Sequence, residues 1–262
     1  MTSFLELHRP GDPLLLPNPW DAGSARILAS LGFRALATTS SGFAATLGRP
    51  DMSVTRAEAL AHAASIVAAT DLPVSADLEN GFADDPAGVA ETVRHAVATG
   101  LAGCSIEDAT GRPHHPVYDA ALAAERVVAA VEAAGDGFVV TARAENHLHG
   151  RDDLRDTIAR LQSFAEAGAH VLYAPGLVSR EQIKTVIDAV DRPVNVLALA
   201  AAPPVAELAE LGVARISVGG AFAFAALGAF VDAATEFRDA GTYGFWGHAK
   251  TGRGAAARAF PT

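Results

Sequence analysis

The stretch LPVSADLENGFADDPAGVAETVRHAVATGLAGCSIED, residues 72–108, contains the repeating unit of this chain. It opens with a short apolar run, LPVSAD (72–77), and closes with a second one, AGCSIED (102–108). Between the two runs, apolar residues recur at intervals of three and four, which is the periodicity of an amphipathic helix. A strand, a helix and another strand in this order predict a parallel βαβ unit.

The same alternation extends along the whole chain. The eight apolar runs are LLLPN (14–18), RALATTS (34–40), LPVSAD (72–77), AGCSIED (102–108), GFVVTAR (137–143), AHVLYAP (169–175), RPVNVLA (192–198) and ARISVGG (214–220). Eight βα repeats in about 250 residues favour a closed (β/α)8 TIM barrel. The alternative is an open doubly wound sheet, but the first turn, NPWDAGSA (18–25), has no glycine-rich phosphate-binding pattern.

No linker or low-complexity tract divides the chain, so we expect one barrel domain over residues 1–262, with residues 220–262 as a C-terminal helical extension. The stretch from Ala221 to Phe230 and the pair Phe245-Trp246 contain more apolar surface than a lone extension needs. This surplus predicts packing on a partner subunit, in a homotetramer or a dimer.

Composition excludes several classes of protein. Thirty acids against twenty bases give a net charge of −10, which is unfavourable for binding nucleic acid. The single cysteine excludes a disulfide framework, and no apolar run reaches the roughly 20 residues of a membrane helix. Because the first residues, MTSFLELHRPGD, also lack the pattern of a secretory signal, we expect a cytoplasmic protein without a membrane partner.

Charged residues follow three consecutive strands at the carboxyl end of the predicted barrel, where active sites of this fold lie. Asp77, Glu107 and Arg143 are 30 and 36 residues apart, about one βα unit each time, and Glu79 shares an extended face with Asp77. Three converging carboxylates repel one another unless a proton or cation intervenes, and oxygen ligands suit Mg²⁺ first and Mn²⁺ second. The alternative is that these acids are solvated helix caps.

Other polar residues at this end have both a functional and a structural interpretation. Ser41-Gly42-Phe43 offers a hydroxyl and successive amides that could bind an anion, although Ser-Gly is common in turns. The pair His147 and His149 has a spacing seen in zinc sites, but without a third histidine in register we do not expect zinc. His114-His115 lies in the loop after the fourth strand, either as a lid with a proton donor or as a solvated turn.

Six segments, in this order and spacing, are similar to the isocitrate lyase/phosphoenolpyruvate mutase superfamily. They are NPWDAGSARILASLGF, TTSSGFAATLGRPD, ADLENGF, SIEDATG, TARAEN and RISVGG, within residues 10–240. The resemblance implies a (β/α)8 barrel, a tetramer in which the last helix swaps between subunits, and binding of Mg²⁺ and a 2-oxo carboxylate. It also implies chemistry that makes or breaks a C–C or P–C bond next to an enolate.

The resemblance also implies roles for individual residues. Substrate binding falls on Trp20, Ser41, Gly42, Phe43 and Asn195, the metal shell on Asp51, Asp77, Glu79 and Glu107, and the catalytic arginine on Arg143. Many relatives have Asp where this chain has Glu79, so the ion could be held here either directly or through water.

The loop after the fourth strand departs from the family pattern. It reads ATGRPHHPVYD (109–119) and lacks both the Lys-x-Cys-Gly-His sequence of isocitrate and methylisocitrate lyases and the Lys- and Asn-bearing loop of phosphonomutases. We therefore do not expect isocitrate or methylisocitrate cleavage.

The expected function is a Mg²⁺-dependent lyase or decarboxylase acting on a small 2-oxo or 2-hydroxy carboxylic acid through an enolate, with His115 or Tyr118 as the proton donor. One alternative is P–C bond chemistry on phosphonopyruvate or phosphoenolpyruvate, as a mutase or hydrolase. An alternative of a different class is a 2-oxo acid binding protein with little turnover.

Overall fold

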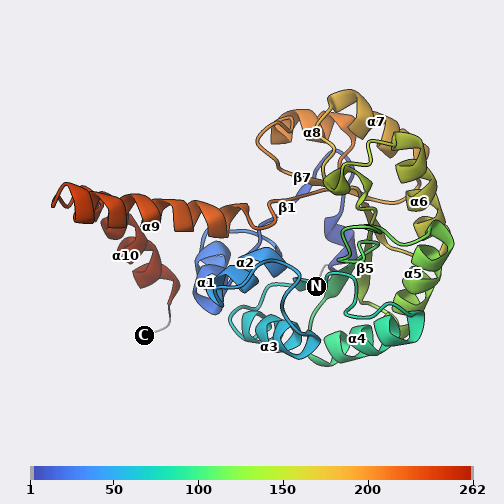
Figure 1. Cartoon of the computed structure of the whole chain (residues 1–262), viewed down its shortest axis with the longest axis horizontal. Coiled ribbons are helices and arrows are strands. Elements are labelled where there is room, and N and C mark those ends of the chain that lie inside the picture. The colour runs from blue at the N-terminus through green and yellow to red at the C-terminus, as the bar shows by residue number, and fades with distance from the viewer. Residues whose placement is uncertain (1–2, 261–262) are drawn as a thin grey trace.

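Eight parallel strands form a ring in the computed structural model, which describes residues 3–260 (Figure 1). The strands are β1 (Leu14–Leu16), β2 (Leu36–Ala37), β3 (Val74–Asp77), β4 (Gly103–Glu107), β5 (Val139–Arg143), β6 (Val171–Tyr173), β7 (Val194–Leu197) and β8 (Arg215–Ser217). Their order in the sheet is β1-β8-β7-β6-β5-β4-β3-β2, and the amide of Ala37 donates to the carbonyl of Pro17 at 3.1 Å where the ring closes. The predicted (β/α)8 barrel is confirmed.

Of the helices in residues 3–260, α1 to α8 surround the ring, α9 and α10 follow them, and six begin at a residue whose side chain caps the first turn. The helices are α1 (Ala22–Ser30), α2 (Ser40–Thr46), α3 (Arg56–Val67), α4 (Pro86–Ala98), α5 (Ala120–Ala134), α6 (Leu154–Glu166), α7 (Arg180–Ala189), α8 (Val205–Leu211), α9 (Ala221–Asp239) and α10 (Trp246–Ala259), with short 3-10 turns η1 (Leu5–Leu7) and η2 (Asn146–His149). For example, the Asp85 side chain accepts the amide of Gly88, and Pro86 occupies the first turn of α4, where no amide donor is needed.

Apolar side chains fill two layers. The larger layer lies between the strands and the surrounding helices, and includes Leu161, Leu172 and Ile183. The smaller layer lies inside the barrel, near the amino ends of the strands. There Phe4 packs with Leu14 and Leu16 and closes the amino end of the barrel. Because this packing shuts one end of the barrel, the mouth for a ligand lies at the other end, where the strands finish.

Strand β2 is shorter than the run RALATTS (34–40) predicts. Only Leu36 and Ala37 are paired as strand residues, because the Thr39 side chain accepts the amide of Gly42 and starts helix α2. This early turn brings the first residues of α2 to the mouth of the barrel, beside the end of β3.

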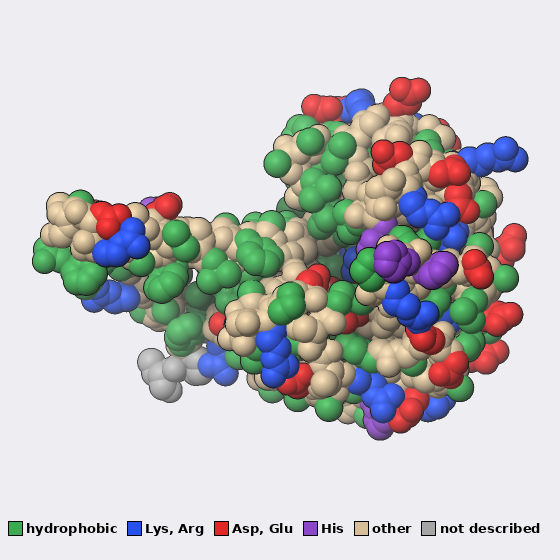
Figure 2. All heavy atoms as spheres, viewed as in Figure 1, with side chains coloured by type: hydrophobic (Ala, Val, Ile, Leu, Met, Phe, Trp, Pro, Cys, Tyr) green, Lys and Arg blue, Asp and Glu red, His purple; other side chains and the backbone are tan. Residues whose placement is uncertain are grey.

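Helices α9 and α10 form an arm beside the barrel: α9 extends away from the barrel, and α10 turns back and packs against α1 (Figure 1). Ala223 is the one buried residue of α9, whereas Phe230 is 67% exposed and Phe237 is 60% exposed. Figure 2 shows hydrophobic side chains along this arm. None of the helices in the described part of the chain has the length and apolar character needed to cross a membrane.

Candidate active site

The ends of β3, β4 and β5 bring their charged side chains to one side of the barrel mouth. Glu107 is paired in register with Arg143, and Asp77 with Ser105, two residues before Glu107. In parallel strands, side chains two residues apart share a face, so Asp77, Glu107 and Arg143 project to the same side of the sheet. The structure therefore brings together three residues that the sequence analysis selected.

Arg143 is the centre of this group. Its guanidinium contacts Asp77 Oδ1 at 3.2 Å, Glu107 Oε2 at 3.1 Å and Glu145 Oε1 at 2.8 Å, and lies 5.1 Å from the centre of the Tyr173 ring. Although burial disfavours the charged guanidinium, the surrounding carboxylates raise the pKa of Arg143 above its ordinary value. A charged, rigid donor fork therefore stands at the mouth, with its orientation set by three acids.

Asp77 is held by the start of helix α2 as well as by Arg143. Its Oδ2 accepts both the amide of Ser40 at 3.1 Å and the Ser40 hydroxyl at 2.9 Å, and its own amide donates to Thr38 Oγ1 at 2.9 Å. A carboxylate at a helix N-terminus is stabilised by the free amides and the helix dipole. This arrangement keeps Asp77 in place at the edge of the mouth.

Glu79 is buried in a strained backbone conformation. Its φ is +49°, a region that residues other than glycine rarely adopt, and its Oε1 is buried without a hydrogen-bond partner. Burial and the nearby charges of Asp77 and Asp51 raise the pKa of Glu79 to about 8. Asp51, on the loop before α3, likewise has a raised pKa, through desolvation and the charge of Asp77.

These four acids fit a hard divalent cation by their chemistry. They offer only oxygen donors, the orphaned Oε1 of Glu79 lacks a partner, and burial also raises the pKa of Glu107 despite the opposing charge of Arg143. Within residues 3–260, no three His, Cys, Asp or Glu side chains are grouped closely enough to form a complete ligand set. Mg²⁺ commonly keeps several waters and takes one or two carboxylates, so the acids suit this ion without enclosing it.

The Ser41-Gly42-Phe43 turn lies at the start of α2, but two of its amides are already used. The amide of Gly42 donates to Thr39 Oγ1 at 3.3 Å, and that of Phe43 donates to the Thr39 carbonyl at 3.0 Å. These two amides therefore form the first turn of the helix in this structure rather than the anion nest that the sequence suggests. The Ser41 hydroxyl, 3.2 Å from Thr39 Oγ1, is the polar group that this turn presents; substrate contact here stays a prediction.

Trp20 and Phe43 are joined by a residue that sequence reasoning did not select. The His62 ring stacks on Phe43 with centroids 3.9 Å apart, and His62 Nε2 lies 3.0 Å from the Trp20 carbonyl oxygen. Burial lowers the pKa of His62, which favours a neutral ring that donates to this carbonyl. Nothing in the helical pattern of α3 distinguishes His62 from a surface histidine.

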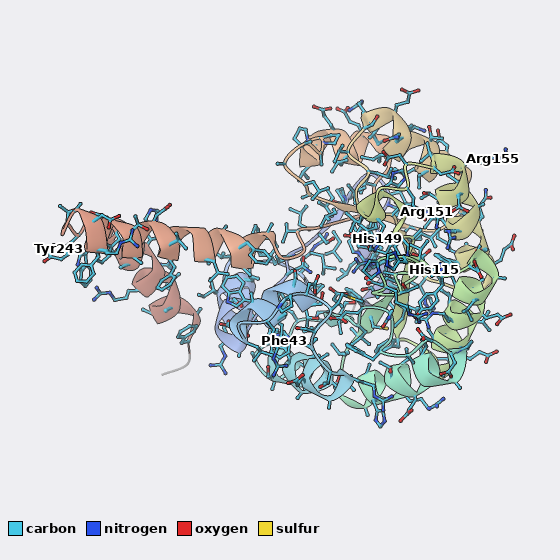
Figure 3. All side chains as sticks on the ribbon, viewed as in Figure 1. Phe43, His115, His149, Arg151, Arg155 and Tyr243 are labelled. Atoms are coloured by element: carbon cyan, nitrogen blue, oxygen red, sulfur yellow. The ribbon has the colours of Figure 1, made fainter. Side chains whose placement is uncertain are left out.

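The two candidate proton donors lie in different surroundings. His115 is exposed on the loop after β4, and Figure 3 shows it on the barrel part of the molecule. Tyr118 is buried, its hydroxyl donates to Asp84 at 2.5 Å, and its ring packs against the Arg126 guanidinium. In this structure neither of them reaches the Arg143 group, so their catalytic roles stay predictions.

The histidine pair of η2 is divided. His147 is nearly buried, 3.2 Å from the Thr157 hydroxyl and 3.4 Å from Asp152, whereas His149 is exposed. With the two rings in separate surroundings, the structure offers no support for zinc ligation by this pair.

Asn195 lines the floor of the mouth together with residues that the sequence analysis missed. Its amide donates to the Ser217 hydroxyl at 2.9 Å, and its carbonyl oxygen accepts from Arg215 Nε at 2.9 Å. Glu145 was also missed; its amide donates to Asp108, which pairs with Arg160 at 2.9 Å. Asn195, Arg215 and Ser217 alternate with apolar residues on β7 and β8, whereas Glu145 follows β5, and only closure of the barrel brings them together.

The match to known proteins covers the whole barrel. A family model described as phosphoenolpyruvate phosphomutase matches residues 4–238. The chain belongs to this family. The matched range includes the strand ends that carry Asp77, Glu107 and Arg143.

Individual relatives agree with this membership of the PEP mutase/isocitrate lyase superfamily. A Burkholderia cenocepacia J2315 structure described broadly as a lyase/mutase is 55% identical, with a TM-score of 0.89 over 93% of this chain and 89% of its own. An uncharacterised protein of Mycobacterium tuberculosis (strain H37Rv) is 35% identical over 219 residues, 83% of this chain and 81% of its own. The structure of 2,3-dimethylmalate lyase, a member of the superfamily, is 30% identical, with a TM-score of 0.80 over 90% of this chain and 85% of its own.

Proposed function

We propose that this superfamily member is a Mg²⁺-dependent lyase or decarboxylase that acts on a small 2-oxo or 2-hydroxy carboxylic acid through an enolate of the pyruvate type. The observation that carries the proposal is the Arg143 fork, held at the mouth by Asp77, Glu107 and Glu145. Relatives named 2-methylisocitrate lyase, oxaloacetate decarboxylase and 2,3-dimethylmalate lyase support the lyase class.

Each part of the site has a distinct task in this reaction. Asp77, Glu79 and Glu107, with Asp51 at the rim, would hold Mg²⁺ (or Mn²⁺), which supplies positive charge next to the oxygens of the bound acid. Arg143 donates to a carboxylate or enolate oxygen and strengthens that contact as negative charge develops. Fixed donors of this kind typically contribute about 3–4 kcal/mol to a reaction barrier.

The enolate carbon must then receive a proton. We assign this task first to His115, because its side chain is exposed on the loop after β4 and a histidine titrates near neutral pH. Tyr118 is the second candidate, and its hydroxyl must leave Asp84 before it can donate elsewhere. The loop carrying both residues folds back on itself, with the Thr110 amide bonded to the Pro116 carbonyl at 2.9 Å, so proton delivery requires this loop to move.

A substrate screen tests the proposal. The purified protein is mixed with a panel of 2-oxo and 2-hydroxy mono- and di-acids, with and without Mg²⁺, and pyruvate release is measured. Incubation with pyruvate and Mg²⁺ in D₂O then reports enolate formation as methyl deuteration. Turnover or exchange that depends on Mg²⁺ supports the lyase; tight binding without exchange identifies a 2-oxo acid binding protein instead.

The family description itself favours a second enzyme activity. Because the matching family is named for phosphoenolpyruvate phosphomutase, P–C bond chemistry as a mutase or hydrolase is the alternative. Incubation with phosphonopyruvate, followed by phosphorus NMR, distinguishes rearrangement to phosphoenolpyruvate from release of inorganic phosphate.

We further propose a cytoplasmic homotetramer or dimer built from one barrel domain with a helical extension over residues 220–262. The exposed apolar side chains of α9 and α10 support assembly, because a monomer would leave them in water. The free, buried thiol of Cys104 agrees with a reducing compartment.

A further inference from the structure

Arg215 begins strand β8 and points into the barrel beneath the Arg143 group. It is paired in register with Asn195 of β7, and it is only 4% exposed. Its guanidinium reaches Thr141 of β5, two residues before Arg143. Arg215 therefore lies one layer deeper in the barrel than the mouth residues described above.

The protein provides hydrogen-bond acceptors for only part of the Arg215 guanidinium. A guanidinium has five N–H donors. Nε donates to Asn195 Oδ1 at 2.9 Å, and Nη1 contacts Thr141 Oγ1 at 3.1 Å and His8 Nε2 at 3.2 Å. Among residues 3–260, Nη2 has no hydrogen-bond acceptor, so its two N–H donors are unused.

All three acceptors of Arg215 are neutral. His8 Nδ1 lies 3.0 Å from the Phe4 carbonyl and donates to it, which leaves Nε2 as the acceptor for Arg215 in a neutral ring. Burial and the charge of Arg215 lower the pKa of His8 to about 3, in agreement with this tautomer. In the described part of the chain, Arg215 forms no salt bridge, although buried charges in proteins are ordinarily paired.

Arg215 remains charged in these surroundings. Burial lowers its pKa to about 10, so the guanidinium is still protonated at neutral pH. Arg143 above it is balanced by acids, but Arg215 is not. The floor of the barrel mouth thus contains a positive charge that the protein itself does not neutralise.

This charge faces a small cavity of about 50 Å³. The charged residues that line it are Asp77, Arg143 and Arg215, which gives one negative charge against two positive ones, a net charge of +1. The remaining polar lining consists of hydroxyl and amide groups, including Ser217, Asn195 and Tyr173. A site for one water takes about 10–15 Å³ by the same measure, so the cavity has room for the three heavy atoms of a carboxylate.

We propose that Arg215 anchors a second carboxylate subsite at the floor of the barrel mouth, and that this subsite selects di-acids over mono-acids. Through Nη2, Arg215 binds the second carboxylate of the ligand, the one that does not lie next to the metal ion. The inference rests on the proposed function, because it takes the ligand to be a 2-oxo or 2-hydroxy acid. It adds the site that recognises the second acid group.

A purely structural role explains fewer of the observations. Thr141, Asn195 and His8 are neutral, and a neutral donor could satisfy them without the cost of burying a charge. The two free donors on Nη2 and the excess positive charge of the cavity have no use in such a role. A bound carboxylate would accept hydrogen bonds from the Nη2 donors and would neutralise the excess positive charge, through a charge-assisted contact.

The test uses (S)-malate and (S)-lactate, 2-hydroxy acids that differ by one carboxylate. Their dissociation constants are measured by calorimetry with Mg²⁺ for the wild type, Arg215→Gln and Arg215→Lys. We expect the wild type to bind malate at least about tenfold more tightly than lactate, the factor that one hydrogen bond to a charged group supplies. Arg215→Gln should bring that ratio close to one while lactate affinity stays within about twofold, and Arg215→Lys should restore part of the preference.

A matched control removes the same charge elsewhere. Arg180→Gln alters an exposed arginine on α7 that pairs with Glu207, and it should leave both affinities unchanged. A preference for malate that survives in Arg215→Gln, or an equal loss for malate and lactate, would overturn the subsite. Melting curves confirm that each variant is folded; should Arg215→Gln fail to fold, equal affinities in the wild type alone refute the proposal.

The outcome separates the subsite from the function on which it rests. Binding of lactate without a preference for malate refutes the subsite and leaves the lyase proposal standing. If lactate, malate and pyruvate all fail to bind the wild type in the presence of Mg²⁺, the proposed function is refuted and the subsite with it.

Discussion

Arg143 Nη1 lies 3.2 Å from Asp77 Oδ1, although the two residues are 66 positions apart in the chain. The contact joins the ends of β3 and β5, and Glu107 of the intervening strand β4 touches the same guanidinium. Ion pairing in a place sheltered from water is much stronger than at a surface. Three strand ends are thereby held as one charged unit.

Replacement of Arg143 by lysine should not preserve activity. An ammonium group has the charge but not the planar two-point geometry of guanidinium. On the best substrate we expect kcat/KM to fall at least about 100-fold, which corresponds to about 2.7 kcal/mol of transition-state stabilisation. We expect kcat to be lower and KM to be higher than in the wild type. Steady-state kinetics measures this. A variant within about twofold of wild type would show that Arg143 only balances neighbouring acids.

Asp77→Ala should abolish Mg²⁺ binding and leave the barrel folded. Removal of one acid takes away a ligand for the ion and the contacts with Ser40 and Arg143, but it also relieves repulsion with Glu79, so the barrel should stay folded. Calorimetric titration with Mg²⁺ and a melting curve measure the two effects. Asp188→Ala, which changes an exposed acid on α7, is the control. If Asp77→Ala binds Mg²⁺ with wild-type affinity, Asp77 does not hold the ion and the metal site lies elsewhere.

The arm should mediate assembly. Light scattering at micromolar concentration should give a multiple of the 26.9 kDa chain mass. Phe230→Asp puts a charge on a side chain that is 67% exposed in the single chain, and we expect it to reduce the mass toward that of one chain. Val128→Asp on α5 provides a comparison outside the arm. A wild-type mass near 27 kDa would contradict the assembly.

Gly42→Ala should destabilise the contact between α2 and the arm. A methyl group at this position would lie 2.5 Å from Thr39 Cγ2 and 3.2 Å from Ala223 Cβ. Overpacking of this kind typically costs about 1–3 kcal/mol. The comparison is Gly252→Ala in α10, where no atom lies within 4 Å and alanine should be neutral or stabilising. Denaturant unfolding measures both; equal stability of the two variants would exclude the clash.

His8 should make folding stability depend on pH. Its pKa is about 3 in the folded protein and about 6.5 when unfolded, so the unfolded state binds an additional proton between these values. Its contribution is complete above about pH 6.5 and is lost as the pH falls toward 3. We expect His8→Gln to reduce the slope of unfolding free energy against pH by up to about 1.4 kcal/mol per unit in that window. Urea unfolding at pH 4–7 measures it; parallel slopes would argue against a buried neutral His8.

Much of the barrel could be predicted because its signals are local. Strand-length apolar runs and helical periodicity are properties of neighbouring residues, and all eight predicted strands are present. The exception in length is β2, where Thr39 competes as a helix cap with strand extension. The positions of Asp77, Glu107 and Arg143 at strand ends were also predictable, because parallel strands finish on the same side of a barrel.

The contacts among the site residues could not be predicted from the sequence in the same way. Glu145 resembles an ordinary loop acid, and Arg215 an ordinary charged residue at the start of a strand. Their roles arise from contacts with Arg143, Thr141 and His8, which come from distant parts of the chain. The pattern SSGF likewise suggests free amides, whereas the helix that forms there uses those of Gly42 and Phe43.

The sequence by itself determined the repeating βα order, the barrel and the acids at one side of its mouth, because short-range periodicity and strand polarity are sufficient to specify them. Only the tertiary structure decided which charges are paired. Closure of the barrel places Arg143 among three acids and leaves Arg215 among neutral acceptors. Electrostatic energy depends on distance and burial, and neither quantity exists for two residues until the chain has folded around them.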